Sequence, residues 1–369
     1  MNTSLKELRQ QTAIGNNAQS VHETSQDRSR RMKVMDVSAP QRPAAETMFA
    51  TPAVVKSRPQ KWLAVPVGAC IALAIHFLVP KREPVASTHY YPLLLSVMLG
   101  LGLLGAILYP FFEGLRKWMR DMCPILGVAT MTAGVWELVT SCLGLLPLPY
   151  FPGPEGVFGS MVSDYKLLFD STWHSLILLT SGYLIGVMIA LVTGVVIGWF
   201  PHARYWGMPL LKIVGPIPAT AWIPLAMVIA PSALLSAIGL IALAVWFPVT
   251  MLTASGINNT RASYLDVART LGARQTYLIF RVAIPGALPN IFIGLFMGLG
   301  TSFLTLVVAE NVGVKSGLGW YVSWAQGWAE YGKVYGALII MAGFFSSIMT
   351  VLFKVRDRVL VWQKGVIKW

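Results

Sequence analysis

The stretch Tyr264-Leu-Asp-Val-Ala-Arg-Thr-Leu-Gly272 is a polar island between two long apolar segments, and it continues to Val282-Ala-Ile-Pro285. The island and its flanks carry the four arginines Arg261, Arg269, Arg274 and Arg281. A charged side chain at the centre of a lipid bilayer costs about 3 kcal/mol. We therefore expect the island to lie outside the hydrocarbon, while the segments on either side of it cross the membrane.

A short helix is predicted within the island. Ser263 is followed three residues later by Asp266, which is typical of a capping box, and a carboxylate in the first turn favours the helix dipole. Gly272 can adopt the left-handed conformation that ends a helix. These signals predict a helix of about two turns over residues 264–271.

A second short helix is predicted from about Gln275 to Ala283. We expect it to stop before Pro285, because proline lacks a main-chain donor and its ring clashes with the preceding turn. The island would then consist of two short helices joined at Gly272.

The composition is typical of a polytopic membrane protein. It is 55% hydrophobic and 12% charged, with a mean hydropathy of +0.61, whereas a soluble domain carries about 25% charged residues. The net charge of +13 is typical of basic cytoplasmic loops and does not indicate nucleic-acid binding. Cys70, Cys123 and Cys142 lack metal-binding spacing, so we expect packing roles for them and no metal site.

Apolar runs of about 20 residues predict eight membrane spans. They cover residues 62–80, 92–112, 123–145, 173–200, 206–230, 233–255, 290–311 and 333–354. The first run begins too late for a cleavable signal. Residues 1–60 are polar and predict a disordered tail, in which a basic cluster either touches anionic lipid or only sets the topology.

The loop charges predict one orientation. The loop over 113–122, the island region over 256–289 and the C-terminal tail are basic, whereas residues 149–171 are mainly acidic. Basic loops stay in the cytoplasm, so both termini and the island are expected there, in a multi-pass protein of the cell inner membrane. The pair Lys81-Arg82, on the outer side in this topology, is the exception.

The island resembles the coupling loop of permease subunits in binding-protein-dependent ABC importers. That pattern is Glu-Ala-Ala, three residues, Gly, nine residues and Ile-x-Leu-Pro, and it is matched here by Asp266, Val267, Ala268, Gly272, Val282, Ile284 and Pro285. Four further stretches resemble the nitrate, sulfonate, taurine and bicarbonate group: Trp136-Glu-Leu138, Leu146-Pro-Leu-Pro-Tyr-Phe-Pro-Gly-Pro154, His174-Ser-Leu176 and the Pro-rich run over 215–225.

The resemblance implies an all-α fold. A six-helix permease core over 113–369 would follow two additional transmembrane helices over 61–112 and the tail over 1–60. It implies that the island docks into a groove on a cytosolic ATPase through Ser263, Asp266, Val267, Ala268, Arg269, Gly272, Ala273 and Pro285. The alternative is an amphipathic loop lying on the membrane surface, which cap, spacing and flanks disfavour.

Further partners follow from the same resemblance. A second permease copy, most simply an identical one, would complete the bundle within membrane lipid, and an extracytoplasmic solute-binding protein would deliver the solute. Loops 149–171 and 312–332 are expected to receive that protein. Trp320, Trp324 and Trp328 recur every four residues and predict a short helix anchored among the lipid head groups.

Proline is concentrated where a translocation pathway is expected. Pro216, Pro218 and Pro224 remove main-chain donors, and lipid cannot satisfy the carbonyls left behind. We therefore place Pro216, Pro218, Trp222 and Pro224 on the pathway, together with Glu310 near the outer end of its span. The alternative for this stretch is a kinked helix packed against its neighbours.

Other intramembrane features have structural interpretations. Glu137 is expected to stabilise the bundle, since no proton-relay partner is evident at its spacing. The pair Gly182/Gly186, together with Gly294, Gly298 and Gly300, predicts close helix packing, with contact between two copies as the second possibility.

No catalytic motif is present in the sequence. It lacks Gly-x-x-x-x-Gly-Lys-Ser/Thr, so ATP would be hydrolysed by a partner subunit, and we expect no cofactor and no enzymatic activity in this chain. Two main functions remain, an ABC importer permease and an ion-coupled secondary transporter without an ATPase, and a purely structural membrane subunit is a third option. Inverted repeats or paired intramembrane acids would favour the second. For the first, the resemblance implies a small anion such as nitrate, a sulfonate, taurine or bicarbonate.

Overall fold

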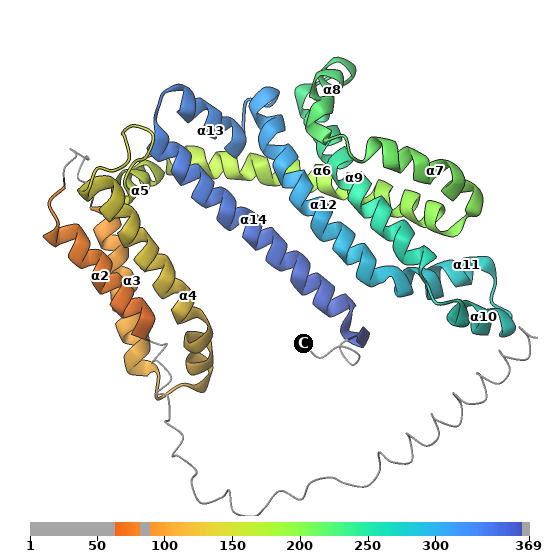
Figure 1. The fold of residues 1–369 in the computed structure, drawn as a ribbon, viewed down its shortest axis with the longest axis horizontal. Coiled ribbons are helices and arrows are strands. Elements are labelled where there is room, and N and C mark those ends of the chain that lie inside the picture. Colours follow the sequence, from red (N-terminus) through yellow and green to blue (C-terminus); the bar gives the residue numbers. More distant parts are fainter. Residues whose placement is uncertain (1–62, 82–88, 364–369) are drawn as a thin grey trace, which may run out of the picture. The chain divides into compact units, whose positions relative to one another are not determined.

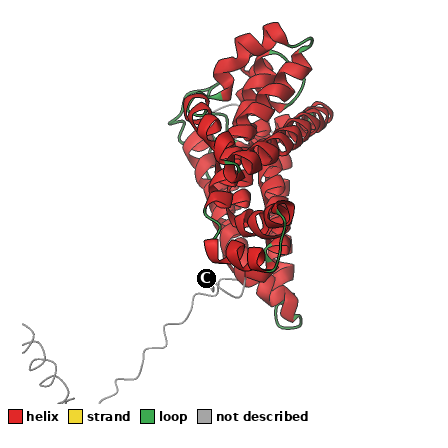
Figure 2. Ribbon diagram, turned by 90° about the vertical axis from the view of Figure 1, so that its right-hand side faces the viewer, coloured by secondary structure: helices red, strands yellow, loops and turns green. Residues whose placement is uncertain are grey.

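The computed structural model describes residues 63–81 and 89–363, and the tail predicted over 1–60 lies outside them. Every regular element in these two ranges is helical (Figures 1 and 2). The elements are α2 (Ala64–Leu78), α3 (Tyr90–Leu108), α4 (Glu113–Glu137), η3 (Leu138–Cys142), α5 (Pro154–Ser163), α6 (Tyr165–Trp199), α7 (Pro201–Val214), η4 (Ala219–Trp222), α8 (Ile223–Ile229), α9 (Ala233–Asn258), α10 (Ala262–Thr270), α11 (Gln275–Tyr277), η5 (Leu278–Ala283), α12 (Ile284–Val312), α13 (Leu318–Gly327), α14 (Tyr331–Val359) and η6 (Val361–Gln363).

Within the described ranges, six helices are long and apolar enough to cross a bilayer, and the bent pair α7–α8 makes a seventh if it counts as one span. The first predicted span, 62–80, corresponds to α2, which has 15 residues. A helix of that length extends about 22 Å, less than the roughly 30 Å of hydrocarbon. The prediction of a full crossing by α2 alone is therefore not met.

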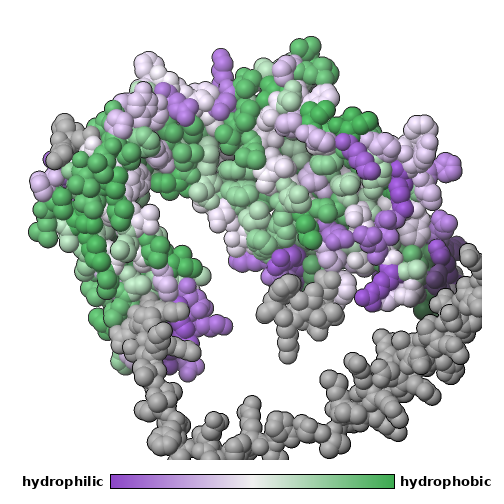
Figure 3. All heavy atoms as spheres, in the orientation of Figure 1, coloured by the Kyte–Doolittle hydropathy of each residue, from purple (hydrophilic) through white to green (hydrophobic). Residues whose placement is uncertain are grey.

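The loop predicted over 113–122 is helical instead. Helix α4 begins at Glu113 and runs through Pro124, so its first turns carry the basic residues assigned to that loop. Its acidic first residue suits the positive end of the helix dipole, and no glycine or proline interrupts the helix between Gly114 and Pro124. In Figure 3 the apolar surface over α2–α4 gives way to hydrophilic residues toward the end where α3 joins α4.

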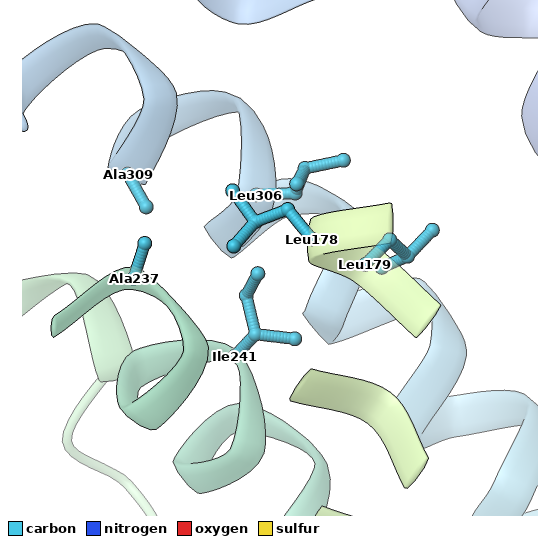
Figure 4. Close-up of a cluster of buried hydrophobic side chains, with 6 residues drawn as sticks. All are labelled: Leu178, Leu179, Ala237, Ile241, Leu306 and Ala309. Carbon is cyan, nitrogen blue, oxygen red and sulfur yellow. The ribbon is translucent and has the colours of Figure 1, made fainter. Parts of the chain in front are cut away.

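The core forms where α6, α9 and α12 meet. Figure 4 shows side chains from all three helices converging in one buried cluster, made of Leu178, Leu179, Ala237, Ile241, Leu306 and Ala309. Glycines set the helix spacing: a Cβ atom at Gly186 would lie 2.7 Å from the carbonyl oxygen of Ala242, and one at Gly294 would lie 3.1 Å from the Cα of Val249. The predicted packing roles are therefore confirmed for Gly182, Gly186, Gly294 and Gly298, whereas the prediction is wrong for Gly300, where an added Cβ atom would meet nothing within 4 Å.

Small residues also join α2 to α4. A Cβ atom at Gly127 would lie 2.7 Å from the main chain of Ala64, and one at Gly134 would lie 3.1 Å from Ala72. The main chains of the two helices therefore pack closely along their length, and van der Waals contact is the main source of helix association in lipid. The N-terminal helices are thus joined to the first span of the predicted permease core.

A buried charge network closes the same contact. Glu137 on α4 lies 2.6 Å from His76 Nδ1 on α2, and Lys81 Nζ lies 2.6 Å from Glu155 Oε2 on α5 and 3.8 Å from Glu137 Oε1. The network explains why Lys81 departs from the loop-charge rule, because its charge is paired within the fold. It also supports the interpretation of Glu137 as a residue that stabilises the bundle.

The glycine contact yields a first prediction. Gly186→Ala should lower the free energy of unfolding by about 1–3 kcal/mol, because the added methyl group meets the main chain of α9. Thermal unfolding of the purified protein in detergent measures the effect. Gly239→Ala is the matched control, since nothing lies within 4 Å of its added methyl group. Equal melting temperatures for the two variants would contradict the close contact.

The charge network yields a second prediction. Lys81→Gln should destabilise the protein by about 2 kcal/mol, because it removes the cation that lies 2.6 Å from the buried carboxylate of Glu155 and 3.8 Å from that of Glu137. The exposed Lys166, also on the side assigned to the outer face, provides the control Lys166→Gln, which should unfold like the wild type. A Lys81→Gln variant as stable as that control would show that the network contributes nothing.

Candidate functional site: a projecting helix and a cavity beside a helix break

The helix α10 connects α9 to the segment that leads into α12 (Figure 1). Its end is a Schellman motif, in which the N–H of Gly272 donates to the carbonyl of Arg269 and the N–H of Ala273 donates to that of Ala268. Gly272 has φ +80°, a conformation that residues with a Cβ rarely adopt. The predicted helix and its glycine stop are therefore confirmed.

The start of α10 differs from the prediction. The helix begins at Ala262 after the N-cap residue Arg261, whose side chain makes no capping bond. Ser263 thus lies inside the helix, and Asp266 lies beyond the first turn, where it pairs with Arg269 at 3.2 Å. The capping box is wrong, because Asn259 and Thr260 still bond to the last turn of α9 and leave only a one-residue linker.

The second predicted helix does not stop before Pro285. Helix α11 spans Gln275–Tyr277, the π-helix η5 spans Leu278–Ala283, and both run on into α12. Pro285 occupies the first turn of α12, where its missing donor is tolerated. The wide π turn before it makes room for the proline ring, which is the physical reason that the helix continues.

A groove of about 640 Å³ lies beside α10. Its lining residues are Tyr264, Val267, Ala268, Leu271, Gly272, Ala273, Arg274, Thr276, Tyr277, Arg281 and Val282. Leu271 is 83% exposed and Val267 59% exposed, so apolar side chains stand uncovered next to two arginines. Uncovered apolar surface rimmed by charge is typical of a protein contact site. Four of the predicted coupling residues line this groove, whereas Ser263, Asp266, Arg269 and Pro285 do not.

The helix break over the Pro-rich stretch is confirmed. Helices α7 and α8 meet at an angle of 86°, with Pro218 as the N-cap of η4 and Pro224 in the first turn of α8. At both positions a missing main-chain donor is tolerated. The chain is therefore free to change direction within the apolar part of the sequence.

A cavity of about 340 Å³ lies at this break. The residues around it come from the break itself and from the middle of α9 and α12: Val214, Gly215, Ile217, Pro218, Ala219, Thr220, Trp222, Leu243, Ala244, Phe247, Pro248, Met297, Thr301, Leu304 and Thr305. Of the five predicted pathway residues, Pro218 and Trp222 line the cavity, whereas Pro216, Pro224 and Glu310 do not.

Sequence reasoning missed the walls that α9 and α12 contribute. On α12, Met297, Thr301 and Thr305 recur every four residues, so they share one face of the helix. On α9, Leu243 and Phe247 have the same spacing. Hydroxyl groups on one stripe of a long apolar span were the available signal for this wall.

Glu310 holds the start of α13. It is 1% exposed, accepts a hydrogen bond from Ser175 Oγ at 2.6 Å, and accepts another from the main-chain N–H of Gly319 at 2.7 Å. The free N–H groups of a helix N-terminus favour a carboxylate. The sequence placed this residue on the pathway near the outer end of its span, but it is buried between α6, α12 and α13 and lies outside the cavity.

The predicted tryptophan helix is α13, and its first two tryptophans, Trp320 and Trp324, pack against neighbouring helices. Trp320 and Trp324 pack against the buried cluster around Tyr321, and Trp328 is 71% exposed. The hydroxyl of Tyr321 donates to Asp164 at 3.0 Å. The predicted short helix is therefore confirmed, and Trp320 and Trp324 also belong to the contact between α13 and its neighbours, while anchoring among lipid head groups stays a prediction.

Known proteins that are similar to this chain are subunits of membrane transporters. The family described as "Binding-protein-dependent transport system inner membrane component" matches residues 182–360. A probable ABC transporter permease protein of Brucella abortus is 30% identical over 235 residues, which cover 63% of this chain and 92% of that protein.

Two similar proteins have named solutes. The bicarbonate transport system permease protein CmpB of Synechococcus elongatus is 27% identical over 217 residues, covering 54% of this chain and 76% of CmpB. The nitrate import permease protein NrtB of the same species is 25% identical over 204 residues, covering 52% and 72%. Among solved structures, the MetNI methionine ABC transporter matches with a TM-score of 0.45 at 18% identity, over 53% of this chain and 98% of that one.

Proposed function

The chain belongs to the binding-protein-dependent ABC transporter permeases, and from that premise we propose that it moves a small solute inward when the closure of a cytosolic ATPase displaces α10. The observation that carries the proposal is the groove beside α10. It presents uncovered apolar side chains and two arginines on a segment that the membrane cannot bury. The partner surface that fits it is an apolar pocket with an acidic rim.

The position of α10 in the chain supports a coupling role. It is joined to α9 through Arg261 and to α12 through a short helical segment, and both of these helices wall the cavity. Close packing of α9 against α12 at Gly256 and Gly294 makes them move together. A displacement of α10 would therefore shift two walls of the cavity at once, as alternating access requires.

The other partners are part of the same proposal. In the orientation that loop charges predict, both termini and α10 face the cytoplasm, while α5 and α13 face the opposite side of the inner membrane. There α5 and α13 would receive a solute-binding protein. A second, identical copy of the chain would bring a second α10 and a second ATPase subunit, and lipid would surround the bundle.

An ion-coupled transporter is the second candidate, because His76 and Glu137 form a buried acid–base pair. That pair lies between α2 and α4, however, and neither residue lines the cavity. A coupling-ion site is expected close to the solute path. The pair is better explained by its structural contact, and we therefore favour the ATP-driven mechanism.

Two observations bear on the chemical class of the solute, and they point to different molecules. The names of CmpB and NrtB favour a small inorganic anion such as bicarbonate or nitrate, as the sequence resemblance also implied. The cavity of this chain, in contrast, has a wall of apolar side chains and hydroxyl groups.

Docking can be tested by co-purification. Leu271→Asp places a carboxylate in the apolar part of the groove, so we expect at least about a tenfold loss of the ATPase subunit that copurifies with the tagged wild-type chain in mild detergent. Ala262→Asp is the matched control, since it adds the same charge at the first residue of α10, outside the groove.

The control should retain the ATPase, and both variants should melt like the wild type. Full retention by Leu271→Asp, or the absence of any copurifying ATPase together with uptake that persists without one, would contradict the proposal. The second of these results would favour the ion-coupled transporter.

A further inference from the structure

We infer that the cavity beside the helix break passes an uncharged, partly apolar small molecule with N–H groups, such as a planar ring or amide, rather than an inorganic anion. The inference rests on the proposed function, because it treats this cavity as part of the solute path. It adds the chemical class of the solute, which the relatives' names alone do not decide for this chain.

The charge of the cavity wall governs how well an anion is stabilised inside it. Among the described residues that line the cavity, none is Asp, Glu, Lys, Arg or His. Lys212 lies on the same helix one turn before the break, but it is exposed and outside the lining. An anion that leaves water for an apolar cavity loses hydration that only fixed cations or hydrogen-bond donors replace. This wall provides no fixed cation.

Hydrogen-bond donors and acceptors on the cavity wall also distinguish between solutes. Thr301 Oγ1 donates to the carbonyl of Ala244 at 3.0 Å, and Thr305 Oγ1 donates to the carbonyl of Thr301 at 3.0 Å. Their hydroxyl hydrogens are therefore used within the protein, while their oxygen lone pairs remain able to accept. The indole Nε1 of Trp222 is buried and has no partner. The walls from α9 and α12 thus offer acceptors that suit N–H groups, while the indole of Trp222 offers one donor that suits a carbonyl oxygen, so these polar groups together fit a neutral amide.

The volume and the contact surface of the cavity suit a planar organic molecule. Trp222, Phe247 and Met297 provide two aromatic rings and a thioether around a volume of about 340 Å³. Cavities of about 300–1,000 Å³ with apolar walls and few polar groups are typical of small-molecule sites. Aromatic faces and polarisable sulfur bind planar rings by dispersion, whereas a small, strongly hydrated anion gains little from them.

The groove beside α10 serves as an internal comparison. Arg274 and Arg281 line it, so it attracts anions in the same molecule in which the cavity does not. One reagent series can therefore be measured at both places. Thr301 represents the cavity and Thr276 the groove, and each is replaced by cysteine in a chain whose Cys70, Cys123 and Cys142 have been changed to alanine.

The experiment measures labelling rates with three methanethiosulfonates that carry a methyl group, a sulfonate or a trimethylammonium group, each normalised to its rate with free 2-mercaptoethanol. The protein is the full chain in lipid nanodiscs, freed of its copurifying ATPase by a salt wash, because a docked ATPase would cover Thr276 in the groove. The sulfonate-to-methyl ratio at Thr301→Cys should be at least about tenfold lower than at Thr276→Cys, since local potential governs the concentration of a charged reagent. Thr220→Cys, on the opposite wall, repeats the test where Thr301→Cys fails to fold.

Protection by solutes identifies the class. Benzamide, a neutral planar amide with N–H donors, should slow methyl methanethiosulfonate labelling at Thr301→Cys, and potassium nitrate or bicarbonate at the same concentration should not. Three results overturn the inference: a sulfonate-to-methyl ratio in the cavity as high as in the groove, protection by nitrate or bicarbonate instead of benzamide, or no labelling of either cavity cysteine by any reagent.

These outcomes are separate from those of the docking test. A chain that retains its ATPase through α10 and whose cavity admits the sulfonate keeps the proposed function and loses this inference. A chain that loses no ATPase when Leu271 is changed to Asp, but whose cavity excludes the sulfonate, keeps the charge-free cavity and loses the docking surface.

Discussion

The close approach of α9 to α6 and α12 is the contact on which the rest of the molecule depends. It exists because glycine stands where a Cβ atom would collide with a neighbouring main chain, as at Gly186 and Gly294. Lipid tails are as apolar as leucine, so close van der Waals contact has to replace the hydrophobic effect as the force between helices. Helices held this tightly act as one body, and the two ends of α10 are fixed to that body.

Two regions of opposite character result from this arrangement. The groove beside α10 combines exposed Leu271 with Arg274 and Arg281, while the cavity at the helix break has no ionisable side chain in its described lining. The first suits a protein partner in water and the second suits a solute that has left water. Because α10 follows α9 and leads through α11 and η5 into α12, the two helices that wall the cavity continue directly into the segment that carries the docking surface.

Local signals predicted the features that local chemistry decides. The φ of +80° at Gly272 and the break around Pro218 follow from the residues themselves, and both were expected. The partner of Lys81 was not, because Glu155 is 74 residues away and only the fold brings the two together. Glu310 was misjudged for the same reason, since its hydrogen-bond donors belong to Ser175 and Gly319. The capping box failed because the chain leaves α9 too abruptly for Ser263 to stand outside the next helix.

The central claim is that α10 lies against an ATPase subunit in the membrane-embedded complex. Its most direct test is a photoreactive benzoylphenylalanine at Val267, which lies in the groove and is 59% exposed. Irradiation of intact membranes should give one dominant adduct, and mass spectrometry should identify its partner as a nucleotide-binding subunit. Adducts only with lipid, or only with another copy of this chain, would contradict the account.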